Sequence, residues 1–162
     1  MNIKNVVVVG GGMMGNALAQ VFASNPDLHV TLKTRALRDD RWDMIINNLD
    51  IMIARGAATE EEKAAILERI HFEVDEAKAY TDADFIIECA PEVMATKQEL
   101  FCNIEKYCSD KCILATNSSV MSCTEIGSKC KHPERVVGAH FWNPGHLIPL
   151  VEVIKSDVTE EW

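Results

Sequence analysis

Two kinds of hydrophobic pattern alternate along this chain: short continuous apolar runs, and longer segments in which apolar residues recur at helical spacing. Short apolar runs bounded by polar or turn-forming residues predict strands over residues 4–9, 29–33, 70–74, 84–89, 112–116, 135–141 and 150–154. Apolar residues at helical spacing predict helices up to about residue 23, and over 38–54, 59–69, 76–80, 92–107 and about 122–130. This alternation predicts an α/β fold with a doubly wound, mostly parallel sheet.

Two of the predicted helices follow each other after only a short connection, which predicts a helical hairpin. The first helix carries one apolar stripe, made of Trp42, Ile45, Ile46, Leu49 and Ile53. Gly56 ends that helix, and Thr59 begins the second one in a capping box with Glu62. Since a doubly wound core does not need both helices, we expect the insertion over 38–70 to form an arm that reaches over the site or a partner.

The later helices give finer predictions about side-chain direction and caps. The helix over 92–107 is expected to face the core with Val93, Leu100, Ile104 and Tyr107. Ser122 or Thr124 is expected to cap the helix that follows the fifth strand.

A glycine-rich loop joins the first strand to the first helix. It consists of Gly10, Gly11, Gly12, Met13, Met14 and Gly15. Gly10, Gly12 and Gly15 fit the G-x-G-x-x-G pattern, in which the first glycine makes the tight turn and the second lets the backbone approach a pyrophosphate. The third glycine allows close packing of helix on strand, and the helix N-terminus adds amide donors. The alternative is a structural turn, but the valine-rich strand before the loop favours a dinucleotide site in a Rossmann-type domain.

Composition and charge narrow the class of protein. The 162 residues are 48% hydrophobic, enough for one domain with a sizeable core. Lys and Arg number 16 against 25 Asp and Glu, and no basic cluster occurs, so we expect no nucleic-acid partner. No apolar stretch is long enough to span a bilayer, so we expect no membrane partner either.

The six cysteines predict reduced thiols rather than a disulfide framework. They form no C-x-x-C pair and no His lies at zinc-ligand spacing beside them, so no metal site is expected. Cys89 and Cys112 lie in apolar runs and are interpreted as small core residues. Because the N-terminus leads directly into a strand rather than a signal peptide, we expect a cytoplasmic protein.

Polar residues gather at the ends of several predicted strands, where ligands bind in an open α/β sheet. They are Glu88 and Glu92, then Asn117, Ser118 and Ser119, then His140 and Asn143, and finally Glu152. A single polar residue at a strand end is easily explained by chance, but the convergence of polar residues from several strand ends is not.

His140 and Glu152 are the strongest candidates for acid–base chemistry. In the strand over 150–154, alternation places Glu152 on an otherwise apolar and buried face, so its carboxylate needs a partner. Pro144, Gly145 and Pro149 allow the intervening loop to fold back and pair the two residues. A carboxylate bonded to an imidazole fixes its tautomer and raises its basicity, as in a general base. The alternative is a stabilising ion pair.

Ser118 is either an ordinary turn residue or has one of two functional roles. Its hydroxyl would lie next to a nicotinamide and a substrate oxygen, or it would be the nucleophile of a Ser-His-Glu hydrolase. No G-x-S-x-G elbow surrounds Ser118, while a dinucleotide loop is present, which favours the first reading.

Four stretches together resemble the NAD-binding domain of the L-3-hydroxyacyl-CoA dehydrogenase family, which includes 3-hydroxybutyryl-CoA dehydrogenases. They are VVVVGGGMMGNALAQ, FIIECAPEVMATKQELF, TNSSV and ERVVGAHFWNPGHLIPLVEVI. The resemblance implies reversible NAD(P)-dependent oxidation of a 3-hydroxyacyl-CoA, with His140 as base, Glu152 as its orienting partner and Ser118 bonding the reacting oxygen. It further implies cofactor contacts for Glu92, Lys97 and Asn143, and coenzyme A contacts on the arm for Asn48 and Arg55.

The chain departs from the family pattern in two places. The family continues into a helical C-terminal domain that mediates homodimerisation, and that domain is expected to begin where this sequence ends, at Trp162. The resemblance therefore implies a cofactor-binding domain over 1–155, with 156–162 beginning a linker. At the end of the second strand, Thr34 and Arg35 stand where an Asp normally meets the adenosine ribose. Arg35 could bond a 2′-phosphate, which favours NADP over NAD, although Lys33 and Arg35 could also be solvated strand ends.

Two other functions stay open at this point. The same machinery in relatives that resemble gulonate or carnitine dehydrogenases uses a free hydroxy acid. A nucleotide-binding module without catalysis is the third possibility, and the intact His140 and Glu152 argue against it.

Overall fold

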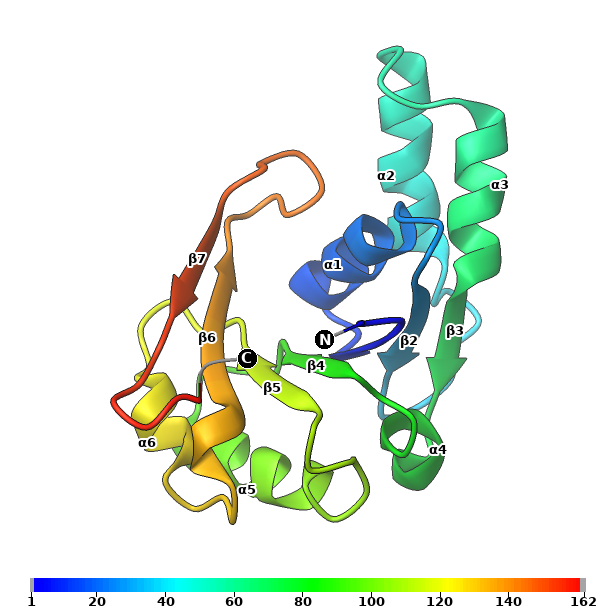
Figure 1. Cartoon of the computed structure of the whole chain (residues 1–162). Helices are drawn as coiled ribbons and strands as arrows, with labels where there is room; N and C mark the ends of the chain where they lie inside the picture. Colours follow the sequence, from blue (N-terminus) through cyan, green and yellow to red (C-terminus); the bar gives the residue numbers. More distant parts are fainter. Residues whose placement is uncertain (1, 161–162) are drawn as a thin grey trace.

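The computed structural model describes residues 2–160, and these form one open sheet with helices on both faces (Figure 1). The strands are β1 (Asn5–Val9), β2 (His29–Lys33), β3 (Ile70–Glu73), β4 (Phe85–Glu88), β5 (Ile113–Thr116), β6 (Val136–Phe141) and β7 (Val151–Ile154). The helices are α1 (Met13–Ala23), α2 (Asp43–Ala54), α3 (Glu60–Arg69), α4 (Glu76–Tyr80), α5 (Met94–Ile104) and α6 (Cys123–Gly127), with a 3₁₀ turn, η1, over Pro133–Arg135. No helix within residues 2–160 is long and apolar enough to cross a membrane.

The strand order places the carboxyl ends of β1 and β4 at the centre of the molecule. The order is β3-β2-β1-β4-β5-β6-β7, and every neighbouring pair is parallel except β6 and β7. The chain runs outward from β1 through β2 to β3, then crosses back to β4, so the winding direction reverses between β1 and β4. This reversal is the position at which an open α/β sheet forms a ligand crevice.

The core has two layers, one on each face of the sheet. Along β1, Val6 and Val8 belong to the cluster under α1 and the arm, whereas Val7 and Val9 belong to the cluster under α5 and α6. All four valines are buried, as the unbroken apolar run predicts. Burying one such side chain stabilises the fold by roughly 1.5–3 kcal/mol, so β1 anchors both layers.

Helices α2 and α3 form the predicted arm, which stands away from the sheet beside α1 (Figure 1). Ile45, Leu49 and Ile66 are buried at its base. The Glu62 backbone N–H donates to the Thr59 hydroxyl at 3.2 Å, and the Thr59 N–H donates to the Glu62 carboxylate at 2.8 Å, which confirms the capping box. The arm is thus fixed at its base and exposed at its tip.

The predicted boundaries of three helices are wrong. Helix α2 begins at Asp43 instead of residue 38, because the Arg38 side chain bonds Asp40 in a separate turn. Helix α5 covers only Met94–Ile104, so Val93 is its N-cap and is 51% exposed. Tyr107 lies beyond the end of α5 and is 38% exposed, so the inward direction predicted for these two side chains is also wrong. Helix α6, which Ser122 caps, ends at Gly127 rather than near Cys130.

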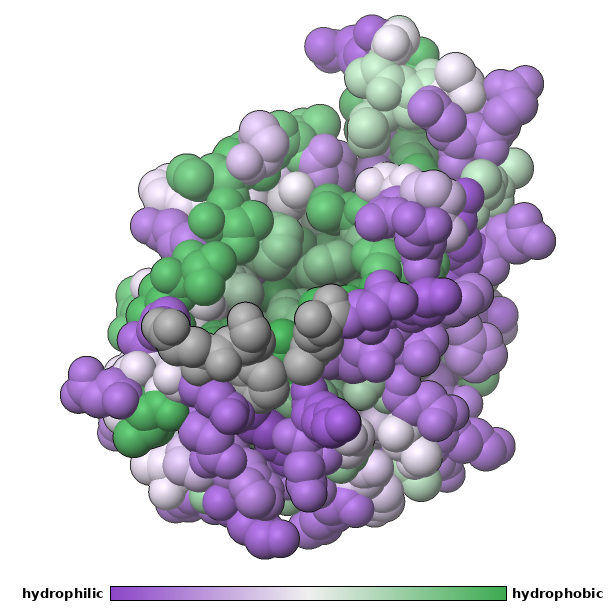
Figure 2. Space-filling model, viewed as in Figure 1, coloured by the Kyte–Doolittle hydropathy of each residue, from purple (hydrophilic) through white to green (hydrophobic). Residues whose placement is uncertain are grey.

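Strand β7 does not lie in the core, contrary to the prediction from its apolar sequence. It is an antiparallel edge strand, and each of its four residues is exposed. The Glu152 side chain is 51% exposed, so the expectation of a buried face is wrong. Figure 2 shows the apolar side chains of this edge as a green band along the side on which β7 lies in Figure 1.

Candidate active site

At two positions of the glycine loop, Gly10 and Gly15, the structure has no room for a side chain. Gly10 has φ +117°, and its N–H donates to the Lys33 carbonyl at 2.9 Å. A Cβ on Gly10 would lie 2.9 Å from the Cys89 carbonyl oxygen, and one on Gly15 would lie 1.7 Å from the Gly10 carbonyl oxygen. These two glycines therefore let β1, β4 and α1 meet at the same point.

Gly12 differs from them, because a Cβ there would meet nothing within 4 Å. It is the N-cap of α1, and no side chain caps that helix or places an acidic group in its first turn. The first amides of α1 are thus left for another acceptor, beside open space where the backbone can approach it. These features fit the pyrophosphate of a dinucleotide. Of the two methionines in the loop, Met13 is exposed and Met14 turns into the adjacent cavity.

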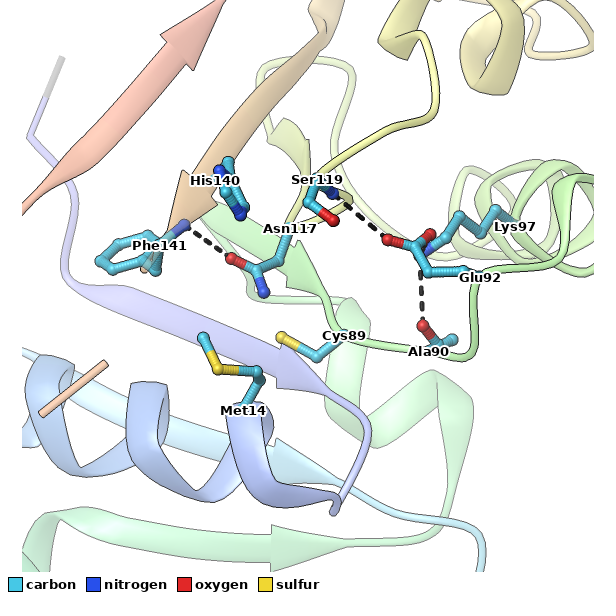
Figure 3. Close-up of a pocket in the computed structure, with 9 residues that line it drawn as sticks. All are labelled: Met14, Cys89, Ala90, Glu92, Lys97, Asn117, Ser119, His140 and Phe141. Carbon is cyan, nitrogen blue, oxygen red and sulfur yellow. Dashed lines mark hydrogen bonds and ion pairs between the residues drawn. The ribbon is translucent and has the colours of Figure 1, made fainter. Parts of the chain in front are cut away.

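A cavity of about 230 Å³ lies at the carboxyl ends of β1, β4, β5 and β6 (Figure 3). It is lined by Met14, Cys89, Ala90, Glu92, Lys97, Asn117, Ser119, His140 and Phe141. The structure therefore brings together residues from the ends of β4, β5 and β6 and from the glycine loop that follows β1.

A buried lysine joins two carboxylates at one side of this cavity. The Lys97 Nζ lies 2.7 Å from Glu88 and 3.3 Å from Glu92, and both Lys97 and Glu88 are buried. The Thr116 hydroxyl donates to the second Glu88 oxygen at 2.7 Å, so the Glu88 carboxylate is paired on both sides. Removing one partner of such a buried pair typically costs about 3–5 kcal/mol, which makes this network a rigid wall of the cavity.

The Glu92 carboxylate holds the tip of β5. The Ser118 hydroxyl donates to both Glu92 oxygens at 2.9 Å, and the Ser119 N–H donates at 3.2 Å. Partial burial pushes the pKa of Glu92 upward, but the Ser118 hydrogen bond and the Lys97 charge outweigh it and hold that pKa below its usual value. Ser118 itself is buried and Ser119 lines the cavity instead, so bonding a substrate oxygen would require the Ser118 hydroxyl to turn from Glu92.

His140 and Glu152 are paired, as their strands predict. They are direct cross-strand partners in β6 and β7, and His140 Nδ1 lies 2.7 Å from a Glu152 oxygen. The hydrogen bond from His140, with a weaker one from Trp142, holds the pKa of Glu152 below its usual value despite some desolvation. Because the ionised carboxylate only accepts, Nδ1 carries the proton and the Nε2 lone pair is left free to accept another.

Asn117 and Cys89 also line the cavity. The Phe141 N–H donates to the Asn117 side-chain oxygen at 2.8 Å, which ties the tip of β5 to the end of β6. Cys89 follows β4, where it is half-buried, packs against the core and lines the cavity, and burial raises the pKa of its thiol to about 12. The position of Asn117 at the end of a parallel strand pointed to it, whereas the apolar run indicated only a core position for Cys89.

The remaining predicted contacts lie outside the cavity. Thr34 follows β2 and touches the glycine loop, since a Cβ on Gly11 would lie 2.8 Å from the Thr34 methyl group. Arg35 is exposed, whereas Lys33 is buried, so the reading of Lys33 as a solvated strand end is wrong. Asn143 is exposed and precedes a cis peptide bond to Pro144.

The two arm residues predicted to bind coenzyme A lie on α2. Asn48 is half-buried within the helix, and Arg55 is its exposed C-cap at the tip of the arm. The structure gives neither of them a contact with the cavity.

Known proteins match almost the whole chain. The family described as 3-hydroxyacyl-CoA dehydrogenase, NAD binding domain, matches residues 5–162. The chain is 34% identical to a 3-hydroxybutyryl-CoA dehydrogenase of Clostridioides difficile over 96% of this chain and 56% of that protein. It is 31% identical to the peroxisomal fatty acid beta-oxidation multifunctional protein MFP2 of Arabidopsis thaliana, over 97% of this chain and 22% of that protein.

Among solved structures, FadB2 of M. tuberculosis superposes with a TM-score of 0.93 at 32% identity, over 99% of this chain and 57% of that one. The chain thus spans less than two thirds of the length of these relatives. The family match, the sheet order and the glycine loop agree, and the chain belongs to the 3-hydroxyacyl-CoA dehydrogenase family, in which it corresponds to the NAD-binding domain.

Proposed function

We propose that this chain is the cofactor-binding part of an enzyme that reversibly oxidises a 3-hydroxyacyl-CoA to the 3-ketoacyl-CoA. The observation that carries the proposal is the His140–Glu152 pair at the cavity beside the glycine loop. The names of the relatives, such as 3-hydroxybutyryl-CoA dehydrogenase, support the substrate class.

The proposed chemistry assigns one step to each polar group. His140 Nε2 takes the hydroxyl proton of the substrate, and Glu152 stabilises the imidazolium that results. A bound NAD would supply the hydride acceptor for the carbon that carries this hydroxyl. Ser118 bonds the reacting oxygen once its hydroxyl has turned from Glu92. Gly10 to Gly15, Glu92, Lys97 and Asn143 hold and orient the cofactor.

The test of this function is the variant His140→Gln. Loss of turnover with acetoacetyl-CoA, by a factor of about 10²–10⁴, is expected because the general base is gone. NADH binding should stay intact, since His140 does not belong to the glycine loop. The assay belongs in the full gene product, and unchanged turnover there would refute the assignment.

A second cavity supports a coenzyme A substrate. It measures about 290 Å³ and lies between the arm, α1 and the loop over 145–149, with Gln20, Met52 and His146 in its lining. Gln20 Oε1 and His146 Nδ1 have no hydrogen-bond partner among the described residues, and desolvation lowers the pKa of His146, which favours the neutral ring. Both atoms are buried, so each would accept from an amide group of a bound substrate only after its side chain turns toward the cavity. We propose that the arm residues Asn48 and Arg55 contribute contacts to the nucleotide part of that substrate.

The family match supports a nicotinamide dinucleotide of the NAD type as the cofactor. We propose that this chain binds the phosphorylated form, NADP, more tightly than NAD. No carboxylate follows β2, where Thr34 stands, and the exposed Arg35 is free to meet a 2′-phosphate. Titration of the chain with NADPH and NADH by fluorescence is expected to give the tighter binding for NADPH, and in Arg35→Ala the advantage should disappear. Clearly tighter NADH binding to the unaltered chain would reject the preference.

We propose that residues 1–155 form the cofactor domain and that 156–162 begin a linker to a helical domain that dimerises; residues 161–162 lie outside the described part of the chain. Within that segment, the Thr159 hydroxyl donates to the Val136 carbonyl and the Glu160 N–H to the Glu134 carbonyl. We also propose a cytoplasmic location, although some relatives are named as peroxisomal.

A dehydrogenase of a free hydroxy acid is the second candidate, because the His140–Glu152 pair would serve it equally well. Comparing turnover of acetoacetyl-CoA with that of free hydroxy acids separates the two functions. Turnover of neither substrate in the full gene product, with cofactor binding retained, would instead indicate a binding module.

A further inference from the structure

We propose that Trp142 is a positioning residue for the acid–base pair, which holds the Glu152 carboxylate in the orientation that receives the His140 imidazole. This inference rests on the proposed function of the pair, but the contact on which it depends can be measured without any turnover.

Two donors converge on one oxygen of Glu152. The Trp142 indole N–H donates to Oε2 at 3.3 Å, and the His140 Nδ1–H donates to the same atom at 2.7 Å. Trp142 follows β6 two positions after His140, so their side chains leave the chain on the same side. The two rings lie next to each other, with centroids 6.0 Å apart. Glu152 is therefore held from two directions by the end of a single strand.

The carboxylate needs this second donor because Glu152 is not buried. Its side chain is 51% exposed and projects from an edge strand, so packing does not select one rotamer. The cross-strand register brings Glu152 opposite His140, but it does not orient the carboxylate. A hydrogen bond from the indole supplies that orientation, and the rigid indole loses little conformational entropy because its side chain has few rotatable bonds.

Trp142→Phe is the discriminating variant, because it keeps an aromatic ring beside His140 and removes only the N–H donor. The pKa of Glu152 is held low by His140 first and by Trp142 in addition, so it should rise in this variant. The measurement is a titration of the Glu152 carboxyl carbon by NMR in the 162-residue chain. The matched control is Trp42→Phe, in which the lost indole packs on Phe72 at the base of the arm and the Glu152 titration should not move.

Turnover in the full gene product provides the second readout. Trp142→Phe should lower kcat/KM about fivefold, the equivalent of one net hydrogen bond of about 1 kcal/mol. In a Glu152→Ala background, which removes the acceptor, the same substitution should have little further effect, since Trp142 acts through the Glu152 side chain. An effect that is equally large in that background would indicate packing alone and would overturn the proposal.

The two readouts separate this inference from the proposed function. An identical Glu152 titration in the unaltered chain and in Trp142→Phe would overturn the positioning role, whatever the enzyme does. If the pKa of Glu152 is higher in Trp142→Phe but the unaltered full gene product is inactive, the contact is supported and the proposed reaction is refuted.

Discussion

At the residue scale, the glycine loop shows that its three motif glycines are required for different reasons. Gly10 and Gly15 have no room for a Cβ because backbone oxygens lie 2.9 and 1.7 Å from the position it would take. Gly12 has open space, so its lack of a side chain is unnecessary for the fold. Because the fold itself does not require a glycine at position 12, the glycine there indicates a bound ligand, which for this family is the dinucleotide.

This difference predicts opposite results for two similar variants. Gly12→Ala should leave the free energy of unfolding within about 0.5 kcal/mol of the unaltered chain, while NADH binding weakens at least about tenfold because the methyl group occupies the approach of the pyrophosphate. Gly15→Ala should destabilise the fold strongly, since the Gly10 carbonyl must move. Urea unfolding and cofactor titration measure both effects. NADH binding as tight in Gly12→Ala as in the unaltered chain would place the pyrophosphate elsewhere.

At the element scale, the hydrophobic pattern predicted the positions of all seven strands, because a buried parallel strand needs an apolar run. It predicted β7 equally well as a strand but placed it wrongly in the core. The face that carries Glu152 was expected to be buried, and only the strand order shows that β7 is the outer edge. The same limit applies to Trp142, whose indole reaches Glu152 only through the pairing of β6 with β7.

Helix ends depend on local bonds, so the sequence predicted them unevenly. The capping box of Thr59 and Glu62 is readable because it depends on two residues at a fixed spacing. The beginning of α2 is not, because Arg38 and Asp40 form a turn that competes with the helix. At the site, the pairing of His140 with Glu152 was predictable, while the buried state of Ser118 and its bond to Glu92 required the packed structure.

The capping box predicts how far the arm depends on its own hydrogen bonds. Thr59→Ala removes the acceptor for the Glu62 N–H and should destabilise the chain by about 1 kcal/mol. Because the cap lies at the exposed end of the arm, NADH binding should not change. The measurement is urea unfolding, with Thr96→Ala on an exposed position of α5 as the control. A loss in Thr59→Ala no greater than that in the control would show that the cap contributes nothing.

At the scale of the whole molecule, the acidic groups of the site connect elements that are far apart in the sequence. Glu92, which precedes α5, holds Ser118 and Ser119 at the end of β5, and Glu152 on β7 holds His140 on β6. Hydrogen bonds hold the pKa of both carboxyls low, so each accepts a proton more readily in the unfolded chain than in the folded one. The stability of the sheet edge around the cavity is therefore linked to pH.

The sign of this linkage predicts a loss of stability in acid. The contribution of Glu92 is fully present above its unfolded pKa, near 4.5, and is lost as the pH falls through its lower folded pKa. The free energy of unfolding, measured with urea between pH 7 and pH 3, should thus fall below about pH 4.5. Glu92→Gln should flatten this fall, because the glutamine cannot titrate, whereas Glu99→Gln on an exposed position of α5 should not. Parallel curves for Glu92→Gln and the unaltered chain would mean that the Glu92–Ser118 bond is not coupled to folding, and that the tip of β5 is held by its neighbouring strands alone.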